Sequence, residues 1–171
     1  MSSGVVHRRI LSAALAVCVA AGAAGCTTAG NPVQPGSVPI DPSAVAAATT
    51  FCIDEVNRLR ASVGDPPLAR SGGIDAFSSE AARVDGAAHQ VHKYFLDTNG
   101  GNGTSVAENV IPWWKVSDYG SVETIVRKGV AMMWAEGESG YHYVNIRGRY
   151  TQMGCGIAIL DGEVTVSQDF K

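Results

Sequence analysis

The sequence W-A-E-G-E-S-G-Y-H-Y-V-N-I-R-G-R-Y-T-Q-M-G-C-G, at residues 134–156, joins an apolar helical segment to a Gly-Cys-Gly turn. It brings Glu136, Glu138 and His142 close together along the chain. Carboxylates and an imidazole at this spacing can bind a metal ion or transfer protons when they face a cleft. The rest of the chain is therefore expected to supply the remaining walls of such a cleft.

The composition describes one globular domain. The chain has 171 residues, of which 46% are hydrophobic and 17% are charged, so it can bury a substantial core. Its formal net charge is −3 at pH 7, and no cluster of Lys and Arg follows the N-terminal region. Nucleic-acid binding therefore has no electrostatic basis, and a monomer is expected.

The N-terminus has the pattern of an export signal. Arg8 and Arg9 precede an uncharged apolar run at residues 10–24, which is shorter than the ~20 residues that span a membrane. The run ends in A-A-G-C, which resembles a bacterial lipobox and predicts removal of residues 1–25 and lipidation of Cys26. The chain would then be anchored to the membrane, facing outward. The alternative is an ordinary signal peptide and free secretion.

Four cysteines remain to be assigned. Cys18 leaves with the signal peptide and Cys26 is used for lipidation, so Cys52 and Cys155 are left as a pair. In an oxidising, exported setting this pair predicts one disulfide between the first helix and a late strand. Two buried free thiols are the alternative.

Beyond the signal peptide, the periodicity divides the chain into a tether and a single domain. Residues 26–42 are rich in Pro and Gly and predict a stiffened tether, and residues 43–171 form the domain. Trp113 and Trp114 are expected in a connecting loop, and a short strand is expected around Glu108. The spacing of apolar residues and the Asp-Gly turn predict helices over 43–63, 77–94 and 122–137, then a hairpin of strands over 156–160 and 163–170.

Five short segments match, in order, the motifs of one protein family. Residues 56–68 contain the run N-x-x-R-x-x-x-G-x-x-x-L, and residues 107–110 read A-E-N-V. Residues 142–146 read H-Y-V-N-I, residues 150–156 read Y-T-Q-M-G-C-G, and residues 166–170 read V-S-Q-D-F. Together they resemble the CAP superfamily, the SCP domain of cysteine-rich secretory and pathogenesis-related proteins, over roughly residues 50–171.

The resemblance implies an α+β fold, an α-β-α sandwich in which helical layers enclose a small, mainly antiparallel sheet. It also implies a cleft that holds two histidines and two glutamates. By residue-to-residue correspondence, Glu108 is the glutamate of the Glu-Asn box and His142 is the C-terminal histidine.

The other two members of the set each have a competitor. Glu138 is the preferred match to the second glutamate, with Glu136 as the alternative because the segment between Trp134 and His142 is longer than in the bacterial pattern. His92 is preferred over His89 as the N-terminal histidine, since it lies at the end of the second predicted helix.

The sequence also departs from the family pattern. Ala107 stands where glycine usually precedes the glutamate, and Arg149 lies within G-R-Y-T-Q, where eukaryotic members have a histidine. If that motif set the alignment, Arg149 would replace a ligand. The alignment through His142 is favoured because H-x-x-N-I also fits it.

The resemblance implies a cell-envelope binding module whose cleft takes a lipid, a sterol-like molecule or a divalent metal such as Zn²⁺. The alternative is a metal-dependent hydrolase that uses His92, His142 and Glu108 or Glu138. A third hypothesis is a surface-interaction protein with a vestigial cleft. No Gly-x-Ser-x-Gly nucleophile motif is present.

Overall fold

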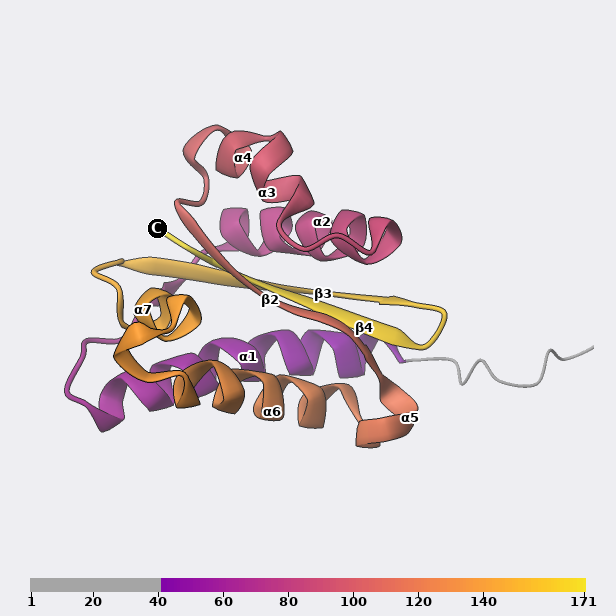
Figure 1. Cartoon of the computed structure of the whole chain (residues 1–171), viewed down its shortest axis with the longest axis horizontal. Coiled ribbons are helices and arrows are strands. Elements are labelled where there is room, and N and C mark those ends of the chain that lie inside the picture. Colours follow the sequence, from indigo (N-terminus) through magenta and orange to yellow (C-terminus); the bar gives the residue numbers. More distant parts are fainter. Residues whose placement is uncertain (1–40) are drawn as a thin grey trace, which may run out of the picture. The chain divides into compact units, whose positions relative to one another are not determined.

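The computed structural model describes residues 41–171, in which a four-stranded sheet lies between two layers of helices (Figure 1). The predicted signal peptide, Cys18, Cys26 and nearly all of the predicted tether lie outside the described residues. Among residues 41–171, no helix has the length and apolar character needed to cross a bilayer. The predicted α-β-α sandwich is confirmed.

The sheet is mainly antiparallel, as predicted. Its order is β1 (Ala69–Arg70), β3 (Gln152–Leu160), β4 (Glu163–Phe170) and β2 (Ala107–Lys115), and only the β1–β3 pair is parallel. Asp161 and Gly162 join β3 to β4 with φ values of +50° and +80°, as expected for a tight hairpin turn. Strand β2 forms an edge of the sheet.

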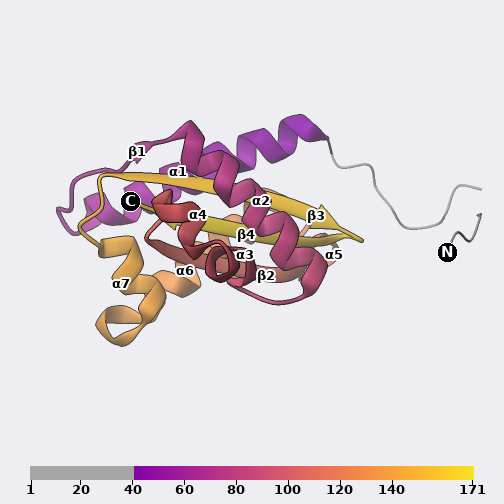
Figure 2. The ribbon, with the colours of Figure 1, turned by 90° about the horizontal axis from the view of Figure 1, so that it is seen from above.

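Helices cover both faces of the sheet (Figures 1 and 2). Helix α2 (Gly72–Ala88) lies on one face, with α3 (Lys93–Asp97) and α4 (Asn99–Gly103) following it, whereas α1 (Pro42–Ser62) and α6 (Val122–Ala135) lie on the other. Short elements complete the chain: α5 (Val116–Tyr119), η1 (Gly137–Ser139) and α7 (Tyr141–Arg147).

The Gly-Cys-Gly sequence allows β3 to lie close to both helical layers. A Cβ atom on Gly154 or Gly156 would collide with the backbone of α2 at Ile74 and Ser78. Between these glycines, Cys155 faces the opposite layer and forms the predicted disulfide with Cys52 of α1, with a Cα–Cα distance of 6.4 Å. The bridge therefore fastens α1 to the centre of the sheet.

Several predicted boundaries were wrong, for local reasons. Helix α2 covers 72–88 rather than 77–94, because His89 caps it at a left-handed φ of +48° and His92, at +60°, starts the separate helix α3. Trp113 and Trp114 belong to β2, where Pro112 and Trp113 form an irregularity in the ladder. Strand β3 begins at Gln152, since it pairs with β1 before the glycines.

Candidate functional site

Helix α7 meets strand β2 at the two motifs that carry asparagine. Asn109 donates from Nδ2 to the carbonyl oxygen of His142 at 3.2 Å. Asn145 donates from Nδ2 to Asn109 Oδ1 at 2.9 Å and to the carbonyl oxygen of Glu108 at 3.3 Å. These bonds bring the Glu-Asn box and the H-x-x-N-I segment together, although 33 residues separate Asn109 from His142.

The first histidine of the predicted set is paired with the glutamate of β2. His92 Nδ1 lies 2.8 Å from Glu108 Oε1, and the Glu108 side chain is buried. This hydrogen bond raises the pKa of His92, against the opposing effect of partial burial. Asp85 of α2 holds the turn by accepting from the backbone N–H of Tyr94 at 2.9 Å. His92 is therefore oriented by one carboxylate, and its turn is positioned by another.

A buried chain of polar side chains lies behind Glu108. Ser167 Oγ is 2.9 Å from Glu108 Oε2 and 2.8 Å from Asp169 Oδ2, and Ser78 donates to the same Asp169 oxygen at 2.7 Å. Burial, and then the charge of Glu108, raise the pKa of Asp169 to about 7, while the serine donors oppose the shift. A hydroxyl has one hydrogen, so Ser167 donates to only one of these carboxyls, and a hydrogen bond to the other requires that carboxyl to be protonated and to donate to Ser167.

Sequence reasoning missed this chain. Ser167 and Asp169 lie two residues apart in β4 and, with Glu108 of β2 opposite Asp169, share the face toward α2. The alternation in β4, in which Glu163, Thr165, Ser167 and Asp169 all fall on one face, was the available signal. The register that places Ser167 and Asp169 beside Glu108 comes from pairing between distant segments, which the sequence did not supply.

The second histidine is paired with Glu136 rather than with Glu138. His142 Nδ1 lies 2.6 Å from Glu136 Oε1, and the backbone N–H of His142 donates to Glu136 Oε2 at 3.2 Å. A Cβ on Gly140 would collide with the Glu136 side chain, so glycine there leaves room for the carboxylate to fold back. Both side chains are about one-third exposed.

The alternative residues of the predicted set lie elsewhere. His89 caps α2, its Nε2 lies 3.0 Å from Glu163 Oε2, and its ring packs against Trp113 with centroids 5.1 Å apart. Glu138 lines a separate hollow on the outer side of α7. The structure thus brings His92 to Glu108 and His142 to Glu136, with both pairs next to the Glu108–Asn109 segment of β2.

A small apolar pocket adjoins the His142–Glu136 pair and is called the His142 pocket below. Its volume is about 110 Å³. Its walls come from β2 and α6, and the histidine and glutamate are the two ionisable side chains among its lining residues, Val110, Ile111, Trp114, Gly129, Met132, Met133, Glu136 and His142. The pocket can hold an apolar group next to a polar, titratable pair.

The fit of these residues to zinc can be judged from their donor atoms. Each histidine uses Nδ1 toward a carboxylate, which leaves Nε2 available to a ligand, as in many metal sites. Catalytic zinc, however, takes three protein ligands. No group of three or more His, Cys, Asp or Glu side chains placed to hold a metal occurs within residues 41–171. The set does not fit a three-ligand zinc centre.

Arg60 of α1 fixes the end of α7 that follows His142. It is 2% exposed and donates to the carbonyl oxygens of Ile146 at 2.6 Å, Gly148 at 3.0 Å and Pro66 at 2.8 Å. Burial lowers its pKa. The first motif of the sequence, which contains Arg60, therefore supports the segment that carries His142.

Replacing Arg60 by methionine is expected to lower the free energy of unfolding by about 2–3 kcal/mol, because three carbonyl groups lose their donor. Urea denaturation measures the effect. The matched control is Arg83→Met, since Arg83 is exposed and contacts the exposed Glu80 of its own helix; a change within about 0.5 kcal/mol is expected there. Equal losses in the two variants would contradict this role of Arg60.

Comparisons with known proteins agree with this architecture. A cysteine-rich secretory protein from Staphylococcus aureus superposes with a TM-score of 0.52 at 13% identity, over 77% of this chain and 40% of its own. An extracellular protein from Bacillus anthracis that contains an SCP domain superposes with a TM-score of 0.50 at 16% identity, over 79% and 45%. The matches span less than half the length of each solved protein. No protein-family model and no curated protein matches the sequence.

Proposed function

We propose, from the premise that this chain has the CAP-type fold of the SCP domains, that it is an exported binding module of the cell envelope and that its ligand is lipid-like. The two solved proteins of this fold are described as secretory and extracellular, in keeping with export. The N-terminal sequence supports the same location. The single observation that carries the binding function is the apolar His142 pocket, with its polar pair.

The pocket favours an amphipathic ligand. Its walls consist of aliphatic, methionine and tryptophan side chains. Binding an apolar group against them is favourable because apolar surface is removed from water. His142 and Glu136 offer a donor and an acceptor to a polar head group. At about 110 Å³ the pocket is smaller than the ~300 Å³ of a typical small-molecule site, so it holds one part of the ligand. The remainder would extend over Met132, which is 61% exposed.

Binding of a fluorescent fatty acid to the purified protein tests this function. Met132→Gln is expected to weaken binding about fivefold, because roughly 1 kcal/mol of apolar contact is lost. His142→Ala is expected to weaken it by a similar factor. The matched control is Leu96→Gln on α3, since Leu96 is 68% exposed and lies outside the pocket. Absence of binding, or equal weakening by the control, would contradict the proposal.

Attachment to the membrane is a separate part of the proposal and rests on Cys26. Cells grown with a clickable fatty-acid probe are expected to label the wild-type protein and to leave Cys26→Ser unlabelled. An unlabelled wild-type protein recovered from the medium would instead support free secretion.

The metal-dependent hydrolase is distinguished by calorimetric titration with Zn²⁺. The binding function requires no tight zinc complex. A complex of 1:1 stoichiometry that is lost in both His92→Ala and His142→Ala would favour the hydrolase, since it would mean that the two histidines bind one ion together.

A further inference from the structure

Helix α7 also has a side opposite the one that carries His142 and Asn145. There, a hollow of about 270 Å³ is lined by Glu138, Tyr143, Val144, Arg147, Gly148 and Arg149. It is called the outer hollow. It shares no lining residue with the His142 pocket, so it is a different site on the same short helix.

One end of the outer hollow carries two guanidinium groups held in place, and Asp65 already neutralises that of Arg147. Arg147 makes a two-pronged ion pair with Asp65, with Nε–Oδ2 and Nη2–Oδ1 distances of 2.8 and 3.2 Å, and its Nη1 lies 3.4 Å from Tyr143 Oη. Arg149 is exposed and, within residues 41–171, forms no ion pair or side-chain hydrogen bond. The buried Arg60 holds the carbonyl of Gly148 between them. The backbone that carries both guanidinium groups is therefore fixed before a ligand arrives.

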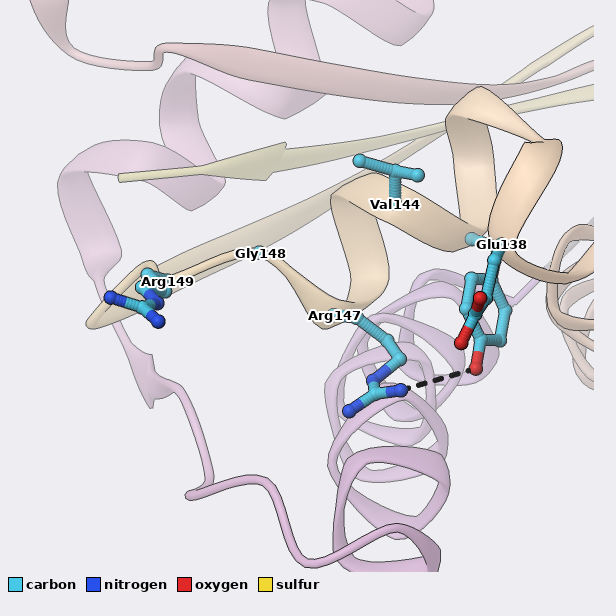
Figure 3. A pocket seen from close by; sticks show the side chains of 6 residues that line it. Glu138, Val144, Arg147, Gly148 and Arg149 are labelled. Carbon is cyan, nitrogen blue, oxygen red and sulfur yellow. Dashed lines mark hydrogen bonds between the residues drawn. The ribbon is translucent and has the colours of Figure 1, made fainter.

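The other end is acidic. Glu138 of η1 lies across the hollow from Arg149, with the Arg147 guanidinium between them in this view (Figure 3). Within the described part of the chain, Glu138 also has no ion-pair partner. Val144 and the ring of Tyr143 add apolar surface to the lining. Within the described residues, the outer hollow thus carries one unpaired cation and one unpaired anion, at opposite ends.

We propose that the outer hollow binds a small zwitterion, with its carboxylate at Arg149 and its ammonium group at Glu138. A short peptide with free termini is the class of ligand that fits. Guanidinium groups match the planar geometry of a carboxylate with two parallel hydrogen bonds. A simple anion would pair only with Arg149, and a simple cation only with Glu138. A zwitterion of suitable length would pair with both. The charge at both ends therefore selects for ligands that carry both signs.

Titration of the ¹⁵N-labelled protein with di-, tri- and tetraglycine tests the proposal. At least one of these peptides is expected to shift the amide signals of Val144, Arg147 and Arg149. The same peptide with its N-terminus acetylated and its C-terminus amidated is expected to bind at least tenfold more weakly. Arg149→Gln and Glu138→Gln are each expected to weaken binding of the free peptide at least tenfold.

Matched controls distinguish the loss of a charge within the hollow from a change in the net charge of the protein. Arg83→Gln and Glu123→Gln remove one exposed charge of each sign on α2 and α6 and are expected to leave peptide binding unchanged. Met132→Gln, which tests the His142 pocket, is also expected to leave it unchanged, so failure of one site is distinguishable from failure of the other. Absence of shifts with all three peptides, equal binding of the blocked peptide, or full binding by Arg149→Gln would overturn the proposal.

Discussion

Removal of the Cys52–Cys155 disulfide is expected to lower the free energy of unfolding by about 4–5 kcal/mol. The bridge joins residues 103 positions apart, and in the chain-entropy model a loop of that length restricts the unfolded chain by roughly this amount. Both sulfur atoms are buried, and Gln168 Nε2 lies 3.6 Å from the sulfur of Cys52, so the pair also belongs to the packed interior.

The double variant Cys52→Ala with Cys155→Ala measures this loss by urea denaturation. A reducing agent provides the control: it is expected to destabilise the wild type by a similar amount and to leave the double variant unchanged. A loss below about 1 kcal/mol would mean that the bridge contributes little and that α1 is held to the sheet by its apolar contacts.

The protein is expected to lose stability as the pH rises from about 4 to 7, because of Asp169. Its folded pKa, about 7, is above its unfolded value of 3.8, so the folded state binds the proton more tightly and stability falls as that proton is lost. The shift corresponds to about 4 kcal/mol at most. Asp85 acts in the same direction, since burial raises its pKa, and His92, whose pKa is raised by the hydrogen bond to Glu108, adds a further loss only above its ordinary value of 6.5.

Urea denaturation of wild type and Asp169→Asn between pH 4 and 8 measures this effect. In the variant, the free energy of unfolding is expected to fall much less over this pH range, because asparagine does not titrate. Asp65→Asn is the matched control: Arg147 lowers the pKa of Asp65, so that group stabilises the fold at higher pH and its contribution is lost only as the pH falls through its folded pKa. A wild type whose stability rises from pH 5 to 7 would contradict the protonated state of Asp169.

The sequence predicted the framework because local signals there agreed with the tertiary structure. The Asp161-Gly162 turn fixed the hairpin, and the two cysteines left after the export signal gave the disulfide. In each case a local requirement, a positive φ in the turn or a partner for a cysteine, limits the choice to few structures.

The site was harder to predict, because its pairs depend on how distant segments meet. Glu136 and Glu138 are both compatible with the sequence; the turn at η1 and Gly140 folds Glu136 back onto His142 and directs Glu138 into the outer hollow. His92 lies beside Glu108 because His89 ends α2 in a left-handed conformation, which is uncommon for a residue other than glycine. The spacing of apolar residues does not indicate that the helix ends at His89.

The tryptophans show the same limit. Trp113 and Trp114 follow Pro112, and proline is disfavoured in a central strand. The chain nevertheless forms the edge strand β2, which accommodates proline at an irregularity and places Trp114 in the wall of the His142 pocket. The edge position is a property of the whole sheet order and so could not be predicted from this segment alone.

The location of bound lipid tests the proposed binding site most directly. Four residues of the His142 pocket carry methyl groups that NMR resolves individually: Val110, Ile111, Met132 and Met133. Titration of the ¹³C-methyl-labelled protein with decanoate is expected to shift these signals together with the His142 ring, while the methyl signals of Leu96 and Val106 stay in place. Saturable shifts at Leu96 and Val106 without any at the pocket, or no saturable shift at all, would contradict the proposed site.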